Sequence, residues 1–160
     1  MSKSNIELRS YLKTICEDLL AEINADRTTI RLDIPKLSIG VDLAIAEAVK
    51  IGVSTISNDS SLNQRDLETI RWLEEYRCPL IQSNFTVAPW PPSALIDLYG
   101  VKAQMLGPII MDRNLIGWIS VHSLTERAWS CREQNLLRDR ANQLTVVLGE
   151  EFRQVFIFDD

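Results

Sequence analysis

The stretch GPIIMDRNLIGWISVHS, residues 107–123, decides the fold. Two apolar runs flank the short polar connection DRN, a pattern that predicts a β-hairpin whose first strand extends back to residue 101. One face of the second strand carries Ile119 and Val121. Because side chains alternate along a strand, the opposite face carries a different set: Trp118, Ser120 and His122. The hairpin therefore has one apolar face and one polar and aromatic face.

A second strand with two different faces lies nearer the N-terminus, in TTIRLDI at residues 28–34. Its apolar side chains, which suit packing under helices, are Ile30, Leu32 and Ile34. The alternate side chains are polar: Thr29, Arg31 and Asp33. If this strand and the hairpin share one sheet, their polar faces line either a ligand pocket or a solvated surface of the kind common in antiparallel sheets.

Two amphipathic helices flank these strands. The first begins at a capping box, Ser4-x-x-Glu7, and ends near residue 24 or 25. The last begins at a second capping box, Ser130-x-x-Glu133, and carries a narrow apolar stripe: Leu137, Ala141, Leu144, Leu148, Phe152 and Val155. A stripe of nearly heptad spacing packs either on the sheet of the same chain or against a second helix in a dimer.

The segment between residues 36 and 100 has weaker patterns. Residues 41–49 fit a helix, or an extended segment from about residue 47. The elements expected beyond them are, in chain order, a short strand near 53–56, a polar loop over 57–64, a helix over 64–77, a strand over 79–85, a rigid turn at 88–92 and a short helix over 91–100. The terminal helices on one face of a mostly antiparallel sheet predict the α+β class and a single domain over residues 1–160.

Composition argues against two classes of partner. The net charge of −5 and the pI near 5.0 disfavour nucleic acid, which requires a basic surface. No apolar run approaches the ~20 residues of a membrane span. Three cysteines without close spacing, Cys16, Cys78 and Cys131, indicate free thiols and a cytoplasmic protein, and their spacing does not indicate a metal or iron–sulfur site.

The chain resembles the GAF domains, sensor modules found in cyclic-nucleotide phosphodiesterases, phytochromes and bacterial regulators. The resemblance rests on ADRTTIRLD at 25–33, on the final amphipathic helix and on these short motifs: Asp26-Arg27, Pro108-Ile109, Ile116-Gly117 and Val121. It implies an antiparallel sheet of five to six strands, with a ligand pocket between one sheet face and the middle helices and loops. It also implies a homodimer through the terminal helices that signals to a partner protein.

The polar strand faces and nearby aromatic residues supply the candidate ligand-binding residues. A strand arginine can bind a carboxylate or phosphate bidentately, so a small anionic molecule is expected if Arg31 faces the pocket instead of pairing with Asp33. Aromatic rings supply flat walls with polar edges. The full candidate set is Thr29, Arg31, Asp33, Trp90, Tyr99, Gln104, Trp118, Ser120 and His122. The sequence assigns no catalytic residue, cofactor or metal.

Two other functions stay open at this point. One is a thiol-dependent enzyme resembling the free-methionine-sulfoxide reductases, with Cys78 or Cys131 and His122 as candidates. The other is a dimerisation or adaptor module with a collapsed pocket. For His122, the single histidine, a pocket role ranks ahead of catalysis, and haem ligation ranks last. In the cyanobacterial branch of the phytochromes, the bilin-attaching cysteine directly precedes a histidine, and Val121 occupies that place here.

Overall fold

A computed structural model describes the backbone of residues 3–156 and the side chains of residues 5–154. The helices and strands are, in chain order, α1 Lys3–Ile23, β1 Arg27–Leu32, β2 Ala46–Val49, α2 Glu68–Tyr76, β3 Leu80–Gln82, α3 Ser93–Asp97, β4 Ala103–Met111, β5 Asn114–Ser123, α4 Cys131–Glu151 and α5 Arg153–Phe156. Short 3₁₀ turns occur at Pro35–Leu37 and Gln64–Asp66. None of the described helices is long and apolar enough to cross a membrane.

The strands form one antiparallel sheet of five strands in the order β2-β1-β5-β4-β3. The predicted α+β class and antiparallel sheet are therefore confirmed. The predicted hairpin is β4–β5, and β5 pairs on its other side with β1. This pairing sets Arg27 opposite His122, Thr29 opposite Ser120, and Arg31 opposite Trp118. The two polar strand faces consequently lie side by side on the same surface of the sheet.

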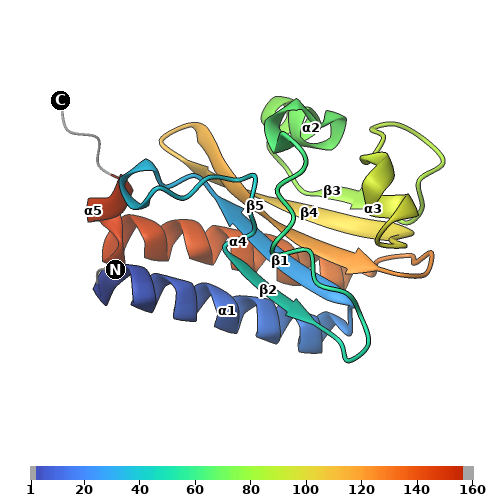
Figure 1. The fold of residues 1–160 in the computed structure, drawn as a ribbon, viewed down its shortest axis with the longest axis horizontal. Helices are drawn as coiled ribbons and strands as arrows, with labels where there is room; N and C mark the ends of the chain where they lie inside the picture. Colours follow the sequence, from blue (N-terminus) through green and yellow to red (C-terminus); the bar gives the residue numbers. More distant parts are fainter. Residues whose placement is uncertain (1–2, 157–160) are drawn as a thin grey trace.

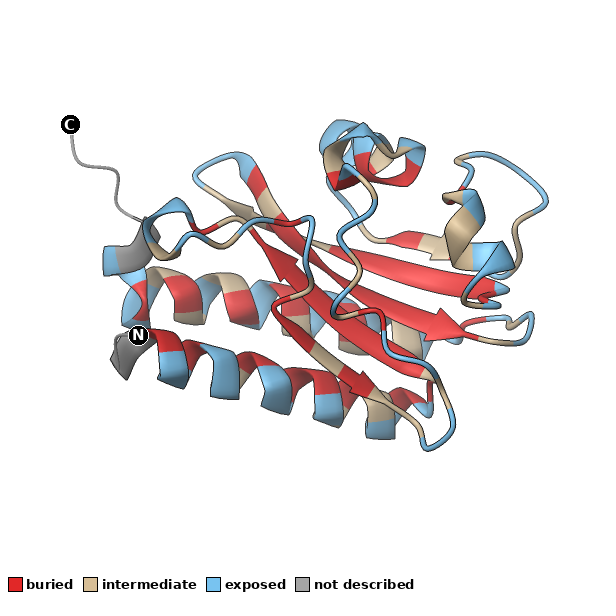
Figure 2. Ribbon diagram, viewed as in Figure 1, coloured by how far each residue is buried: buried red, intermediate tan, exposed pale blue. Residues whose placement is uncertain are grey.

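Helices α1 and α4 run together along the opposite surface of the sheet (Figure 1). The predicted apolar faces of β1 and β5 pack against them, and Figure 2 shows buried residues along the helix sides that face the strands. The stripe of α4 is buried within this chain at Leu137, Ala141, Leu144 and Leu148, and Phe152 is 7% exposed. At roughly 1.5–3 kcal/mol for each large apolar side chain removed from water, this layer is the main source of stability.

The backbones of β5 and β1 lie very close together where the two strands pair at Gly117. A Cβ atom added at Gly117 would lie 2.0 Å from the backbone oxygen of Arg31. Only glycine allows the two backbones to approach this closely. The Ile116-Gly117 motif therefore has a packing function in the sheet.

Several predicted boundaries change. Of the segment at 41–49, residues 46–49 are extended and form β2, and residues 41–45 are turns and bends instead of helix. The strand predicted near 53–56 is wrong. There, the backbone N–H of Ile56 donates to the carboxylate of Glu47 over 2.8 Å instead of to another strand. The helix predicted over 64–77 begins with a 3₁₀ turn before α2, the strand predicted over 79–85 shortens to β3, and the last helix ends at Glu151 before α5.

The capping predictions have different outcomes. At Ser130, the hydroxyl accepts from the N–H of Glu133 and the Glu133 carboxylate accepts from the N–H of Ser130, which confirms the predicted capping box. At the N-terminus, α1 already includes Lys3, so Ser4 lies inside the helix and not at its cap. The side chains of Ser4 and Val155 lie outside the described residues.

The second surface of the sheet is covered by α2, α3 and the loops around them (Figure 1). A smaller apolar cluster forms here, in which Trp118 and Leu106 of the sheet pack against Ile70 and Leu73 of α2. Both sheet surfaces are therefore covered, which explains why all six residues of β1 are buried. The polar face of the sheet lies beneath this second cover.

Candidate ligand-binding pocket

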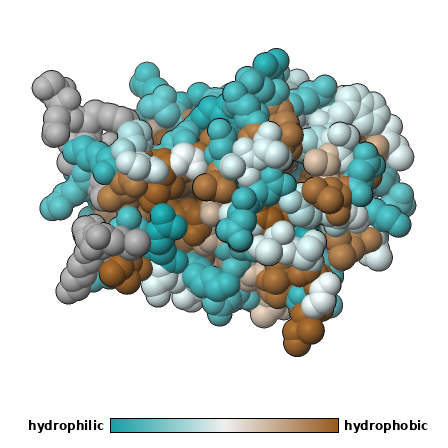
Figure 3. Space-filling model, in the orientation of Figure 1, coloured by the Kyte–Doolittle hydropathy of each residue, from teal (hydrophilic) through white to brown (hydrophobic). Residues whose placement is uncertain are grey.

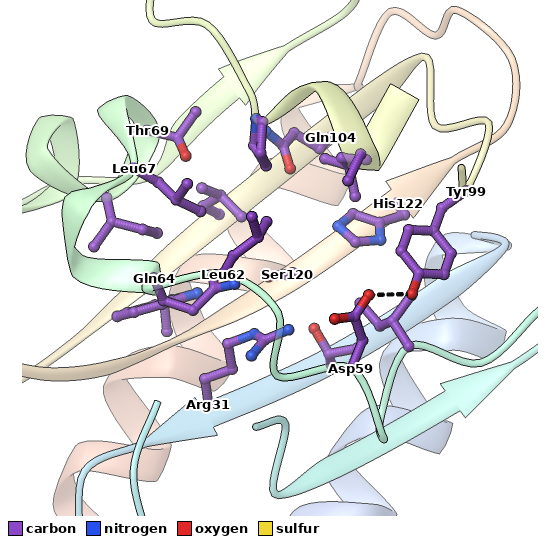
Figure 4. Close-up of a pocket in the computed structure, with 18 residues that line it drawn as sticks. Arg31, Asp59, Leu62, Gln64, Leu67, Thr69, Tyr99, Gln104, Ser120 and His122 are labelled. Carbon is purple, nitrogen blue, oxygen red and sulfur yellow. Dashed lines mark hydrogen bonds between the residues drawn. The ribbon is translucent and has the colours of Figure 1, made fainter. Parts of the chain in front are cut away.

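A cavity of about 70 Å³ lies between the polar sheet face and the cover formed by the 56–64 loop, α2 and α3 (Figure 4). Seven of the nine predicted residues line it: Thr29, Arg31, Tyr99, Gln104, Trp118, Ser120 and His122. The volume is small beside the ~300–1,000 Å³ of pockets that enclose drug-sized ligands. In this conformation the cavity fits a molecule of few atoms. A larger ligand could bind only if the cover moved.

The strand register arranges the cavity floor in three rows. Arg31 and Trp118 form one row, Thr29 and Ser120 the middle one, and His122 the third, opposite Arg27. Opposed side chains in an antiparallel pair lie about 5 Å apart at their Cβ atoms. The floor thus runs from a cation and an indole, through two hydroxyls, to an imidazole.

Arg31 is 6% exposed, and its guanidinium has one hydrogen bond, from Nη1 to the backbone oxygen of Val41 over 2.8 Å. Burial lowers the pKa of Arg31. The carboxylates of Asp42 and Asp59, which lie beyond ion-pair distance, raise it. No carboxylate lies within ion-pair distance of Arg31 among the described residues. A buried cation without a counter-ion is costly, so it marks a place where an anion would be stabilised.

The middle row supplies two hydroxyl groups, those of Thr29 and Ser120. Thr29 is 1% exposed, and its Oγ1 atom is buried with no hydrogen-bond partner in the described structure. A buried hydroxyl of this kind costs about 1–3 kcal/mol unless a bound molecule satisfies it. Ser120 also lines the cavity and stands opposite Thr29. Both hydroxyls can donate to a ligand atom held beside Arg31.

His122 is a neutral hydrogen-bond donor toward the cavity. Nη1 of Arg27 lies 3.1 Å from Nδ1 of His122, and a guanidinium can only donate, so Nδ1 accepts and the ring proton resides on Nε2. Burial and the charges of Arg27 and Arg31 lower the pKa of His122 to about 3. Arg27 itself is fully buried, donates to the backbone oxygen of Ser54 and lies 3.8 Å from the carboxylate of Glu47. Its charge is therefore compensated within the protein.

Gln104 is oriented by a relay of two amides. Its Nε2 donates to Oε1 of Gln82 over 2.8 Å, and Nε2 of Gln82 donates to the backbone oxygen of Pro89 over 2.8 Å. The relay leaves Oε1 of Gln104 as an acceptor at the cavity wall. It also ties that wall to the turn at 88–92 that leads into α3.

The mouth of the cavity carries a hydrogen bond between two loops. The hydroxyl of Tyr99, just after α3, donates to Oδ2 of Asp59 in the 56–64 loop (Figure 4). Ser61 donates to Oδ1 of Asp59 from its backbone N–H, over 2.9 Å, and from its hydroxyl, over 2.6 Å. These donors, the hydroxyl of Ser61 foremost, lower the pKa of Asp59 to about 2 and keep its carboxylate ionised.

Two predicted site residues lie outside the cavity lining. Asp33 follows the end of β1, where its carboxylate accepts from the N–H of Val41 and pairs with Arg65. It holds the cover in place and does not pair with Arg31. Trp90 lies in the 88–92 turn and is 51% exposed, and its backbone N–H donates to the carboxylate of Glu68 over 2.6 Å.

Eleven further residues complete the cavity lining and were not predicted from the sequence. Ten of them come from the cover, whose loops have no periodic pattern that would indicate a facing: Ile56, Asp59, Leu62, Gln64, Leu67, Thr69, Ile70, Pro92, Ala94 and Leu95. The eleventh, Leu106, lies on β4 two residues after Gln104, so strand alternation would have placed it on the same face. Arg27, which positions His122, was also missed. Extending the alternation of Thr29 and Arg31 by one step toward the N-terminus would have placed it on the same face.

The cysteines and His122 lie in different parts of the molecule. Cys16 is buried among the apolar residues of the helix layer. Cys78 lines a separate groove with Pro108 and Arg138, and Cys131 is the first residue of α4. None of the three lines the cavity that holds His122. The structure therefore does not bring together the thiol and imidazole that the enzymatic alternative required.

Solved structures with the same fold are numerous, although no family model and no curated protein sequence matches the chain. A cyanobacteriochrome receptor PixJ structure superposes with a TM-score of 0.75 at 18% identity, covering 93% of this chain and 99% of that one. The PixJ GAF domain of Thermosynechococcus elongatus gives 0.70 at 18% identity, covering 98% and 96%. A phycoerythrobilin-bound GAF domain from a cyanobacterial phytochrome gives 0.74 at 16% identity, covering 94% and 89%. The chain therefore has a GAF-like fold.

Proposed function

We propose that this GAF-like domain is a sensor that binds a small anionic molecule in the cavity above β1 and β5. One observation carries the proposal: Arg31 is a buried cation on the cavity floor that has no counter-ion among the described residues. The unpartnered hydroxyl of Thr29 is next to it along the same strand face. Charge-assisted hydrogen bonds to an anion would satisfy both groups.

The ligand we propose is much smaller than the chromophores named for the neighbouring structures. A bilin would not fit a cavity of about 70 Å³ without displacement of the cover. No thiol lines the cavity, so nothing there can attach a chromophore covalently. The shared fold supports a ligand-binding role, and the residues of this chain set the ligand class.

Two connections from the cavity support a signalling role. The amide relay from Gln104 reaches the 88–92 turn. A bound ligand would order this turn and thereby move the cover. On the floor, Arg27 contacts Glu47 of β2, and the backbone oxygen of Glu47 accepts from Nζ of Lys13 on α1 over 2.6 Å. Ligand binding would thus shift the population of conformations of α1 and the cover together.

We expect the signal to pass through a homodimer formed by the outer sides of α1 and α4. The stripe that suggested this dimer is already buried in the chain, but Ile6 is 58% exposed and Val146 is 55% exposed. The start of α1 and the end of α4 lie at the same end of the molecule (Figure 1). On the face shown in Figure 3, hydrophobic residues lie in separate groups among hydrophilic ones.

The test is calorimetric titration of the purified protein with small carboxylates, after native mass spectrometry has shown whether a ligand co-purifies. Arg31→Gln is expected to weaken binding at least about tenfold, because a buried charge-assisted pair is lost. Arg138→Gln removes the same charge from an exposed position outside the cavity and should leave binding unchanged. Equal binding by wild type and Arg31→Gln, or no binding of any anion, would overturn the proposal.

A further inference from the structure

The cavity lining holds one positive and one negative residue, Arg31 and Asp59. In the described part of the chain, these two side chains do not form an ion pair with each other. Figure 4 shows both side chains directed toward the same space, Arg31 from the floor and Asp59 from the loop above it. The charge of Arg27 is compensated by Glu47, and His122 is neutral.

We propose that the ligand of this cavity is a small zwitterion that has an apolar side group, with its anionic group on Arg31 and its cationic group on Asp59. The inference rests on the proposed function and specifies the ligand class of the same site. A simple anion would satisfy Arg31 but would meet the negative charge of Asp59 within the same cavity. A molecule that carries both charges satisfies both residues.

Hydrogen bonds from neighbouring residues hold the carboxylate of Asp59 in place. Ser61 supplies two donors to Oδ1, and the Tyr99 hydroxyl donates to Oδ2. A carboxylate has about four acceptor positions, so Oδ2 retains one for a ligand. The carboxylate is therefore held in place by neutral donors and keeps its full negative charge for a cationic partner.

Apart from Gln64 and Thr69, the rest of the lining on the cover side is apolar. Leu62, Leu67 and Leu95 line the cavity from the cover, and Ile70 packs there against Leu106 and Trp118 of the sheet. A charged ligand without an apolar part would leave these apolar side chains in contact with water. An aliphatic or aromatic side group would be buried against them, with a favourable free energy of about 25 cal/mol per Å² of apolar surface removed from water. An α-amino acid with a small apolar side chain has all three features.

The test compares three compounds that share one skeleton: leucine, isocaproate, which lacks the amino group, and isoamylamine, which lacks the carboxylate. Matching sets based on alanine and phenylalanine cover smaller and larger side groups. Each is titrated calorimetrically into the full-length wild-type protein. We expect the amino acid of at least one set to bind about fivefold tighter than its carboxylate analogue, the ratio that corresponds to the ~1 kcal/mol of a partly exposed ion pair.

Asp59→Asn gives the diagnostic result. It should weaken amino-acid binding and strengthen binding of the carboxylate analogue, because the repulsion disappears with the charge. Asp66→Asn, at a carboxylate outside the cavity whose side chain is 67% exposed, should change neither. If the carboxylate analogues bind through Arg31 as tightly as the amino acids, the zwitterion inference is wrong and the proposed function stands. If no anion binds, both fail.

Discussion

The guanidinium of Arg27 and the imidazole of His122 lie opposite each other on β1 and β5, and Nη1 of Arg27 donates to Nδ1 of His122 over 3.1 Å. This contact determines the tautomer of the only histidine in the chain, and burial together with the charge of Arg27 lowers its pKa and keeps it neutral. A protonated imidazole would set two cations against each other in a buried site. His122 is consequently a neutral donor at pH 7 and not a proton shuttle.

The tautomer of His122 can be observed directly by NMR of nitrogen-labelled protein. We expect one set of imidazole signals with an accepting Nδ1 and a protonated Nε2, unchanged between pH 5 and 8 because the pKa is about 3. The single histidine makes the assignment unambiguous. A titration midpoint near the usual ~6.5 would contradict the buried contact with Arg27.

The depressed pKa of His122 also predicts loss of stability in acid. The unfolded chain binds a proton below about pH 6.5, whereas the folded protein resists protonation down to about pH 3, so stability is complete above pH 6.5 and falls between these values. Between pH 7 and pH 5 we expect His122 to lower the free energy of unfolding by about 2 kcal/mol, which urea denaturation at the two pH values would measure. His122→Gln should remove this part of the slope, and an unchanged slope in that variant would assign it to other groups.

Removing the charge of Arg31 should stabilise the ligand-free protein. Arg31→Met eliminates a buried cation that has one hydrogen bond and no counter-ion among the described residues. We expect a gain of roughly 1 kcal/mol in the free energy of unfolding, together with loss of stabilisation by ligand. A loss of more than about 1 kcal/mol would show instead that Arg31 serves mainly as a structural residue.

Gly117→Ala should destabilise the sheet by about 3 kcal/mol or more. The added methyl group would lie 2.0 Å from the Arg31 backbone oxygen, which belongs to the paired strand and cannot move aside without breaking the ladder. Gly149→Ala is the matched control, because its Cβ meets nothing within 4 Å on α4. It should stabilise the protein by about 0.5–1 kcal/mol, since alanine favours helix. Equal effects in thermal unfolding would refute the packing argument.

The packing of α4 and its assembly can be separated with two substitutions. Leu144 is fully buried against the sheet, so Leu144→Ala should cost about 2–5 kcal/mol of folding stability. Val146 is exposed, so Val146→Asp should leave the fold intact and lower the dimer fraction measured by light scattering after size-exclusion chromatography. A monomeric wild type, or a dimer unaffected by Val146→Asp, would rule out this interface.

Strand alternation is sufficient to predict which side chains face the pocket. Because successive side chains point to opposite faces, the position of Ile30 and Val121 under the helices forces Thr29 and Ser120 to the other surface. The same reasoning failed for Asp33, which lies beyond the last residue of β1 and does not follow the two-residue period. Trp90 was predicted from its aromatic ring alone, and its place in a turn gives no signal of where the side chain points.

The amino-acid sequence by itself determined the α+β class, the β4–β5 hairpin, the capped last helix and the chemistry of the cavity floor. These follow from local periodicity and capping, which need no knowledge of distant residues. Tertiary structure alone decided that the stripe of α4 packs within the chain, that Arg27 donates to a buried and neutral His122, and that Asp59 and Tyr99 meet in the cover of the cavity. These depend on contacts between segments far apart in the sequence, whose loops carry no periodic signal of where they fold.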